Sequence, residues 1–340
     1  MLTGGGDAPG LNAAIRAVGR RAIANNDTLF GIRNGWAGLV GEGNVIELGR
    51  PSLSGILSLG GTILGTSREN PLKHEHGVDE VAANMERLRL DALVVIGGDD
   101  TLSVAAALAE RGLPVVGVPK TMDNDLDITE YCIGFDTAVG IVAEALDRLH
   151  TTAASHHRVM VVEVMGRDTG WVAVMGGLAG GADMIIIPEF AVTIDEVVEH
   201  LEARLRAGSE FSIIVVAEGV EMEGLASKDA VGDRRDAFGH VMLSRRAVGE
   251  SLAGTVEQRT QHESRTTVLG HVQRGGSPSA YDRIWATRVG AAAYDLIEAG
   301  AYGHMPVVVG GSVQRARIAD VVATQRRVPR ELYDLARVFY

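Results

Sequence analysis

The sequence predicts an α/β protein built from mostly parallel sheets with helices on both faces. Short apolar runs alternate with segments of helical periodicity, which is the pattern of parallel strands joined by crossover helices. The 340 residues are enough for two such units, each with its own hydrophobic core. Strands are expected at 28–32, 91–96, 114–118, 159–164, 184–187, 212–217, 266–270 and 307–309, with a short one at 1–3.

Helices are expected where apolar residues recur at helical spacing, at 11–24, 79–88, 136–153 and 194–205, the second with Asp79 as its N-cap. The first break between units is expected near Asp136, with a return to the first unit near His271. The expected domains are therefore 1–136 with about 271–304, and 137–270 with the C-terminal segment 305–340. The polar, turn-rich stretch 221–239 is typical of a surface insertion.

The bulk composition narrows the class of function. With 32 basic and 44 acidic residues the net charge is −12, which argues against nonspecific binding to nucleic acid or to an anionic membrane. There is no apolar run of transmembrane length and no signal-peptide pattern. The single cysteine, Cys132, excludes an internal disulfide, fits a reducing cytoplasm, and is expected to be a small buried residue. Only three residues precede the first glycine loop, so we expect translation to start further upstream.

Polar groups that suit phosphoryl transfer follow two neighbouring apolar runs. Gly97-Gly98-Asp99-Asp100-Thr101 follows the first, and 119–125 (Pro-Lys-Thr-Met-Asp-Asn-Asp) follows the second. Because the carboxyl ends of parallel strands share one crevice, these turns are expected to face a common site. That site would contain Asp99, Asp100, Lys120, Thr121, Asp123 and Asp125.

Two interpretations of these carboxylates stay open at this point. Asp99 and Asp100 repel each other unless a cation or hydrogen-bond donors hold them, and a Mg²⁺ shared with a phosphate is a natural reason, but two solvated aspartates would also fit. In the second turn, one carboxylate can accept a proton from an attacking hydroxyl while Lys120 and Thr121 hold the transferring oxygens. An Asx-rich turn explains the acidic residues there but not the lysine.

Other motifs are weaker when taken singly. The loop 4–10 fits neither the dinucleotide fingerprint nor the P-loop, which leaves an anion site at a helix start or a plain tight turn. Arginines beside expected strand ends suit phosphate monoesters, namely Arg158, Arg167, Arg265 and Arg274. The histidine pairs at 74/76 and 156/157 lack a third ligand at a sensible spacing, so no metal site is expected there.

Taken together, the motifs resemble the 6-phosphofructokinase family. The matching segments span nearly the whole chain in the family's order: 4–10, 60–68, 97–101, 119–125, 156–158, 162–167, 217–219, 267–278 and 281–283. The resemblance implies two similar Rossmann-like, three-layer α/β/α domains with the active site between them. It assigns the phosphoryl donor to the larger domain, 1–136 with 271–304, and fructose 6-phosphate to the smaller one.

The resemblance also implies roles for single residues. Asp123 would be the general base for the 1-hydroxyl of fructose 6-phosphate, Asp125 would support it, and Asp99 would hold Mg²⁺. Thr121 and Arg167 would stabilise the transferring phosphoryl group. Further implied contacts are Gly5 and Arg68 to the donor, Met165, Gly166 and Glu218 to the sugar, and His271 and Arg274 to its 6-phosphate, joined by Arg158 and Arg265 from a neighbouring subunit.

The phosphoryl donor is predicted from two positions. ATP-dependent members of the family usually have glycine where Asp100 stands, and a carboxylate there would fill and repel the space of the α-phosphate. Members that use pyrophosphate pair such an aspartate with a lysine at the position of Lys120, although some ATP-dependent members also carry that lysine. The resemblance therefore favours reversible transfer from pyrophosphate, giving fructose 1,6-bisphosphate and phosphate in glycolysis or gluconeogenesis.

Three alternatives remain at the level of sequence. The nearest is the same reaction with ATP. A regulatory subunit that senses sugar phosphate without catalysis is disfavoured because Asp99, Asp123 and Asp125 are all present. A lipid or NAD kinase shares the Gly-Gly-Asp turn but not the arginine motifs. The basic positions that bind nucleotide effectors in allosteric bacterial members are not matched around Arg16, Arg20 and Arg21, so little ADP activation is expected.

Overall fold

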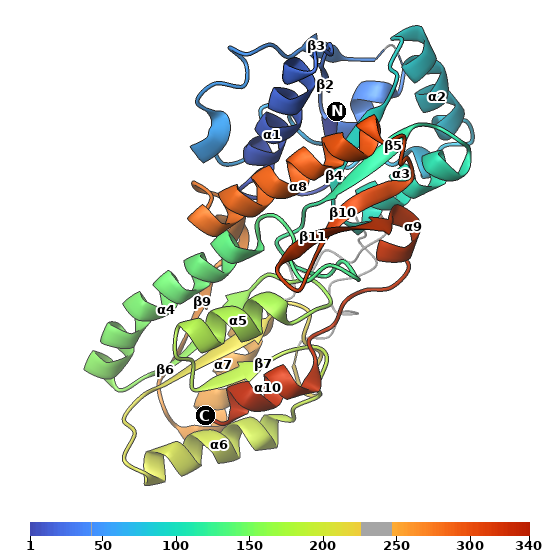
Figure 1. Ribbon diagram of the computed structural model, residues 1–340. Helices are drawn as coiled ribbons and strands as arrows, with labels where there is room; N and C mark the ends of the chain where they lie inside the picture. Colours follow the sequence, from blue (N-terminus) through green and yellow to red (C-terminus); the bar gives the residue numbers. More distant parts are fainter. Residues whose placement is uncertain (42, 226–246) are drawn as a thin grey trace. The chain divides into compact units, whose positions relative to one another are not determined.

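The computed structural model describes residues 1–41, 43–225 and 247–340, and it divides into two compact units (Figure 1). Unit 1 is Met1–Thr137 with Arg274–Arg326, and unit 2 is Ala138–Gln273 with Arg327–Tyr340. The chain therefore passes between the units three times. Most of the expected insertion at 221–239 lies outside the described residues.

Unit 1 is organised around a parallel sheet in the order β1-β4-β5, formed by β1 (Leu2–Thr3), β4 (Leu93–Gly97) and β5 (Val115–Pro119). Every residue of these strands is buried, which explains their near-continuous apolar character. Two antiparallel hairpins complete the strands: β2 (Phe30–Ile32) with β3 (Val45–Glu47), and β10 (His304–Val309) with β11 (Ser312–Arg317).

The longer helices of unit 1 are α1 (Leu11–Ala24), α2 (Gly77–Arg87), α3 (Asp99–Glu110) and α8 (Ala280–Glu298), followed by the short α9 (Ile318–Val321). Although 255 residues lie between the end of α1 and the start of α8, the two helices lie side by side (Figure 1). The short 3-10 helices are η1 (Gly35–Leu39), η2 (Ile56–Ser58) and η3 (Pro71–Lys73). The core joins the apolar face of α3 to β4 and β5.

Unit 2 has a fully parallel sheet in the order β7-β8-β6-β9. Its strands are β6 (Val159–Val164), β7 (Met184–Ile186), β8 (Ser212–Ala217) and β9 (Ser264–Val268). Its helices are the main part of α4 (Phe135–His156), α5 (Trp171–Ala179), α6 (Ile194–Arg206), α7 (Val248–Thr260) and α10 (Arg330–Arg337). The 3-10 helix η6 (Gly270–Arg274) lies where the chain returns to unit 1.

The predicted fold class is confirmed, since parallel sheets alternate with helices along the chain. The ranges expected for α1, β6 and β8 match the structure residue for residue. The prediction for Asp79 was wrong: α2 begins at Gly77, so Asp79 lies in its first turn and pairs with Arg111 instead of capping. Strand β9 begins at Ser264, two residues before the expected start.

The last crossing between units also differs from the expectation. We expected residues 305–340 to belong with 137–270, but 305–326 lie in unit 1. The reason is a set of hydrogen bonds around β10: Gly303 N–H donates to the Val115 carbonyl at 2.8 Å, and Glu130 N–H donates to the Val308 carbonyl at 2.8 Å. Strand β11 gave little signal because four of its six residues are exposed. Within the described ranges, no helix is long and apolar enough to cross a membrane.

Candidate active site

Three loops of unit 1 meet at the carboxyl ends of β1, β4 and β5. The Gly4 N–H donates to the Ile96 carbonyl at 2.9 Å, which joins the first loop to β4. Gly97 is in register with Pro119, and Lys120 N–H donates to the Gly97 carbonyl at 3.0 Å. The prediction that the 97–101 and 119–125 turns follow adjacent parallel strands is therefore confirmed, and the loop 4–10 joins them.

Lys120 is buried beneath the glycine loop. Its side chain is 2% exposed, and its Nζ donates to the carbonyls of Gly4 at 3.0 Å and Gly6 at 2.5 Å. Between them Gly5 has a φ of +76°, and a Cβ there would lie 3.6 Å from Nζ. Thr66 Oγ1 donates to the Gly5 carbonyl at 2.6 Å. A positive charge is therefore fixed against a loop whose backbone is suited to close approach by an anion.

Thr101 explains why two of the glycines are needed. It is 1% exposed, and a Cβ built on Gly4 or Gly97 would lie 2.6 or 2.4 Å from its side-chain atoms. Any larger residue at either glycine would clash with it. Thr101 belongs to the 97–101 motif but was assigned no role from the sequence. In the structure it determines how closely the loop 4–10 and the 97–101 turn approach each other.

Asp99 and Asp100 lie in the first turn of α3, with Gly98 as the N-cap residue. From the sequence we expected both residues to lie in a turn before a helix, whereas in the structure they are the first two residues of the helix. Exposed N–H groups and the macrodipole favour carboxylates at this position, so the helix itself offsets part of their mutual repulsion. Both side chains are half-buried, at the edge where Gly97 adjoins Pro119.

The turn after β5 places Asp123 and Asp125 on either side of Asn124. Asn124 has a φ of +53°, and its Oδ1 accepts from the Cys132 N–H at 3.0 Å while its Nδ2 donates to the Glu130 carbonyl at 3.3 Å. Left-handed backbone is tolerated by Asn, so this residue forms the turn and the aspartates flank it. Asp123 and Asp125 are 4% and 5% exposed.

The loop behind this turn is fixed by the buried carboxylate of Asp282, which lies in the matching segment 281–283 but was assigned no role from the sequence. Asp282, at the start of α8, accepts from Tyr131 Oη, from Gly134 N–H at 2.6 Å, and from both the N–H at 2.8 Å and the hydroxyl of Thr137. Burial raises the pKa of Asp282 and of Tyr131. Cys132 is fully buried as expected, and burial raises the pKa of its thiol, which keeps it neutral.

Two further predicted residues belong to unit 1. Arg274 lies against the glycine loop: its Nη1 donates to the Asp7 carbonyl at 3.1 Å, and a Cβ on Gly6 would come within 2.5 Å of that nitrogen. Its guanidinium therefore lies on the loop that also covers Lys120. Arg68 is exposed and follows Thr66, the residue that bonds to Gly5.

In unit 2, Met165, Gly166, Arg167 and Glu218 come together where β6 and β8 end. Glu218 is 6% exposed, and its Oε1 accepts from Gly166 N–H at 3.4 Å and from Arg167 N–H at 3.2 Å. Gly166 has a φ of +153° and Arg167 one of +52°. A Cβ on the residue after Glu218, Gly219, would come within 1.8 Å of the Arg167 carbonyl oxygen. The structure thus brings four of the predicted residues together in the two adjacent turns that follow β6 and β8.

Arg158 and Arg265 lie at the other end of the same sheet. Arg158 precedes β6, and Arg265 is the second residue of β9. Both pair with Glu263, Arg158 at 2.8 Å, and this lowers the pKa of the Glu263 carboxyl. Six residues of β6 separate this end from Met165, which is about 20 Å of strand. His271 lies in η6 and is exposed.

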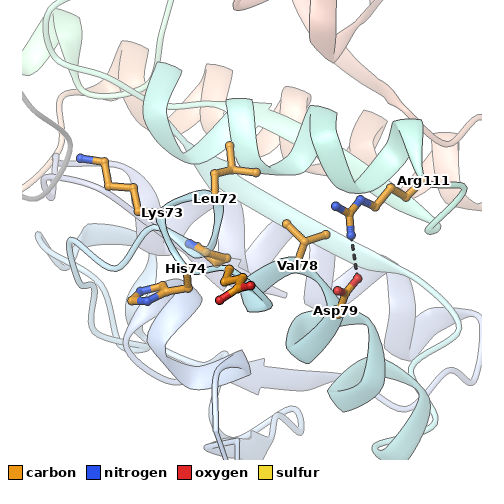
Figure 2. Close-up of a pocket in the computed structure, with 8 residues that line it drawn as sticks. Leu72, Lys73, His74, Val78, Asp79 and Arg111 are labelled. Carbon is orange, nitrogen blue, oxygen red and sulfur yellow. Dashed lines mark hydrogen bonds and ion pairs between the residues drawn. The ribbon is translucent and has the colours of Figure 1, made fainter.

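A separate surface cavity of about 490 Å³ lies beside α2 and the end of α3. Figure 2 shows Leu72 and Val78 among its lining residues and the ion pair of Arg111 with Asp79, whose Nη1 and Oδ1 are 2.7 Å apart. None of the predicted site residues lines it. Its His74 pairs with Glu69, and among the described residues no group of three or more His, Cys, Asp or Glu side chains is arranged to hold a metal ion.

Comparison with known proteins accords with this geometry. The phosphofructokinase family model matches residues 1–297. The pyrophosphate–fructose 6-phosphate 1-phosphotransferase of Streptomyces coelicolor is 51% identical over the whole of this chain and 98% of its own length. The ATP-dependent 6-phosphofructokinase 3 of the same organism is 44% identical, over 98% of this chain and 97% of its own.

Among solved structures, a pyrophosphate-dependent phosphofructokinase from Marinobacter aquaeolei aligns with a TM-score of 0.83, covering 97% of this chain and 84% of its own. At 24% identity this likeness concerns the fold. The sequence relatives match from end to end, and four of the motifs that suggested the family, 97–101, 119–125, 162–167 and 217–219, lie at the carboxyl ends of parallel strands. The chain therefore belongs to the phosphofructokinase family.

Proposed function

We propose that this enzyme transfers a phosphoryl group from pyrophosphate to the 1-hydroxyl of fructose 6-phosphate, in a reversible reaction. The observation that carries the choice of donor is the pairing of two features in unit 1. Lys120 presents a buried ammonium to the glycine loop, and Asp100 adds a second carboxylate to the start of α3. The first suits a compact diphosphate, and the second disfavours a nucleotide that carries a further phosphate.

The buried turn of unit 1 supplies the acid–base chemistry. Asp123 accepts the proton of the 1-hydroxyl as that oxygen attacks phosphorus, and Asp125 supports it from the other side of Asn124. Thr121 Oγ1, which also accepts from the Asp123 N–H at 3.1 Å, stabilises the transferring group together with Arg167. Gly5, Lys120 and Arg68 bind the donor phosphates.

The sugar is recognised by the turn of unit 2. Met165 and Gly166 line the sugar pocket, and Glu218 accepts hydrogen bonds from its hydroxyls, in a position fixed by the Gly166 and Arg167 amides. His271 and Arg274 are assigned to the 6-phosphate, with Arg158 and Arg265 from a neighbouring copy. The contacts of Arg274 with Gly6 and Asp7 support a role beside the donor loop as well.

A Mg²⁺ ion fits the donor set of unit 1. Asp99 offers one half-buried carboxylate at the start of α3, and Mg²⁺ is usually held by one or two carboxylates together with substrate phosphates. Asp99 would hold the ion, which would neutralise phosphate charge during transfer.

A glycolytic phosphosugar substrate and the single cysteine fit a cytoplasmic enzyme. The arginines Arg158 and Arg265, which lie apart from the other sugar-phosphate residues of unit 2, fit a homo-oligomer whose active sites are shared between copies.

The donor is tested by comparing pyrophosphate with ATP in one coupled assay of fructose 1,6-bisphosphate formation. We expect turnover with pyrophosphate and Mg²⁺ and little with ATP. Asp100→Gly is expected to raise the ATP rate at least tenfold by removing a like charge from the donor pocket, with Lys120→Gly added if the single change is insufficient. If the unaltered enzyme is active with ATP but not with pyrophosphate, the proposed donor is rejected.

A further inference from the structure

The last segment of unit 1, residues 321–326, is bonded to the chain that follows the Asp123 turn. Arg326 N–H donates to the Asp125 carbonyl at 2.8 Å, and Asp127 N–H donates to the Val321 carbonyl at 3.2 Å. Leu126 and Gln325 form an antiparallel bridge between these two bonds. The backbone of the 321–326 segment therefore fixes the path of residues 125–127, immediately before the chain passes to unit 2 at Arg327.

Gln325 adds a side-chain contact to this backbone pairing. Its Nε2 donates to Oδ2 of Asp125 at 3.0 Å. The Asp125 side chain is buried, so its direction depends on the groups around it, whereas the Gln325 side chain is largely exposed. An amide is a neutral donor: it orients a carboxylate without the strong preference for the ionised form that an ammonium or guanidinium would impose.

We propose that Gln325 is a positioning residue for phosphoryl transfer, because its amide fixes the orientation of the Asp125 carboxylate beside the Asp123 base. This inference rests on the role proposed above for Asp125. Titratable groups near Asp125 include Asp123, Asp127, the neutral Cys132 thiol and Arg326. The Arg326 guanidinium donates to the Glu130 carbonyl at 3.0 Å, and Thr324 Oγ1 donates to Asp127.

The first test compares Gln325→Leu with Thr324→Val. The two changes lie side by side and each removes one side-chain hydrogen bond from the 321–326 segment, but only the first reaches Asp125. We expect Gln325→Leu to lower kcat about tenfold with KM for both substrates changed less than about twofold. Thr324→Val should keep kcat within about twofold of the unaltered enzyme. Equal losses in both variants would overturn the proposal.

The second test uses pH and does not depend on the leucine variant folding. Gln325→Glu is close in shape but places a second carboxyl beside Asp125. Since two carboxylates at one site are disfavoured until they share a proton, we expect its kcat deficit to be largest at neutral pH and to shrink toward acid pH. For Gln325→Leu the deficit should vary less with pH. A Gln325→Glu profile parallel to that of the unaltered enzyme would contradict the inference.

One more variant distinguishes a failure of the proposed role of Gln325 from a failure of the proposed role of Asp125. Asp125→Asn is measured in the same assay. If it keeps the unaltered kcat, the role of Asp125 fails and the role of Gln325 fails with it. If it loses activity while both Gln325 variants remain unaffected, the proposed function stands and only the positioning role of Gln325 is rejected.

Discussion

At the scale of single residues, Asp123 carries the chemistry of the proposed reaction. Removing its carboxylate takes away the group that accepts the 1-hydroxyl proton, and general base catalysis contributes about 10²–10⁴ in rate. We expect Asp123→Ala to lower kcat by at least about a hundredfold while the protein still binds fructose 6-phosphate, as measured by calorimetry. Asp127→Ala, in the same loop, is the control and should stay near the unaltered rate. Substantial turnover by Asp123→Ala would remove it as the base.

The candidate site residues were predictable from the sequence where polar and charged side chains directly follow an apolar strand. Asp99, Lys120, Thr121 and Asp123 follow two apolar runs, and a parallel sheet necessarily brings the ends of such runs to one edge. Gln325 gave no such signal. It lies 200 residues from Asp125 and within a polar stretch, so no local pattern relates the two. Positioning residues that act through long-range contacts are invisible to spacing arguments.

At the scale of elements, the start of α8 holds the loop between β5 and α4. The Asp282 carboxylate accepts four hydrogen bonds from Tyr131, Gly134 and Thr137, and it is fully buried. An asparagine there turns an NH₂ group toward at least one of those donors, which leaves buried polar groups unsatisfied.

We therefore expect Asp282→Asn to destabilise unit 1 by about 1–3 kcal/mol, seen as a lower Tm. The control is Asp295→Asn on the same helix, which removes only the negative charge that pairs with the exposed Arg21. It should leave Tm nearly unchanged. If the two variants melt together with the unaltered protein, Asp282 is not the anchor of this loop.

Elements with an apolar face were predicted more securely than polar ones. The buried strands β6 and β8 and the amphipathic helix α1 were located to the residue because burial determines their pattern. The hairpin partner β11 exposes most of its side chains, and its pairing with β10 depends on the tight turn at Gly310 and Gly311, both at positive φ. The assignment of 305–326 to the wrong domain followed directly from missing that hairpin.

At the scale of the whole molecule, the position of Arg158 and Arg265 decides how many chains a site needs. Within unit 2 they lie at the amino ends of β6 and β9, whereas Met165, Arg167 and Glu218 lie at the carboxyl ends. Because a strand of six residues separates the two groups, one copy of unit 2 does not present both to the same small sugar phosphate. A second copy of the chain must contribute the arginines if both groups bind the substrate.

This arrangement predicts that two inactive variants restore each other. In a hybrid of Arg158→Ala and Asp123→Ala chains, one site carries both changes and another carries neither, provided that Arg158 serves the neighbouring copy. Co-expressing the two variants with different affinity tags and purifying the doubly tagged hybrid should recover roughly a quarter to a half of the unaltered specific activity. Each parent alone should remain far below that level. If the hybrid is no more active than its parents, each chain completes its own site and Arg158 acts within the copy that carries it.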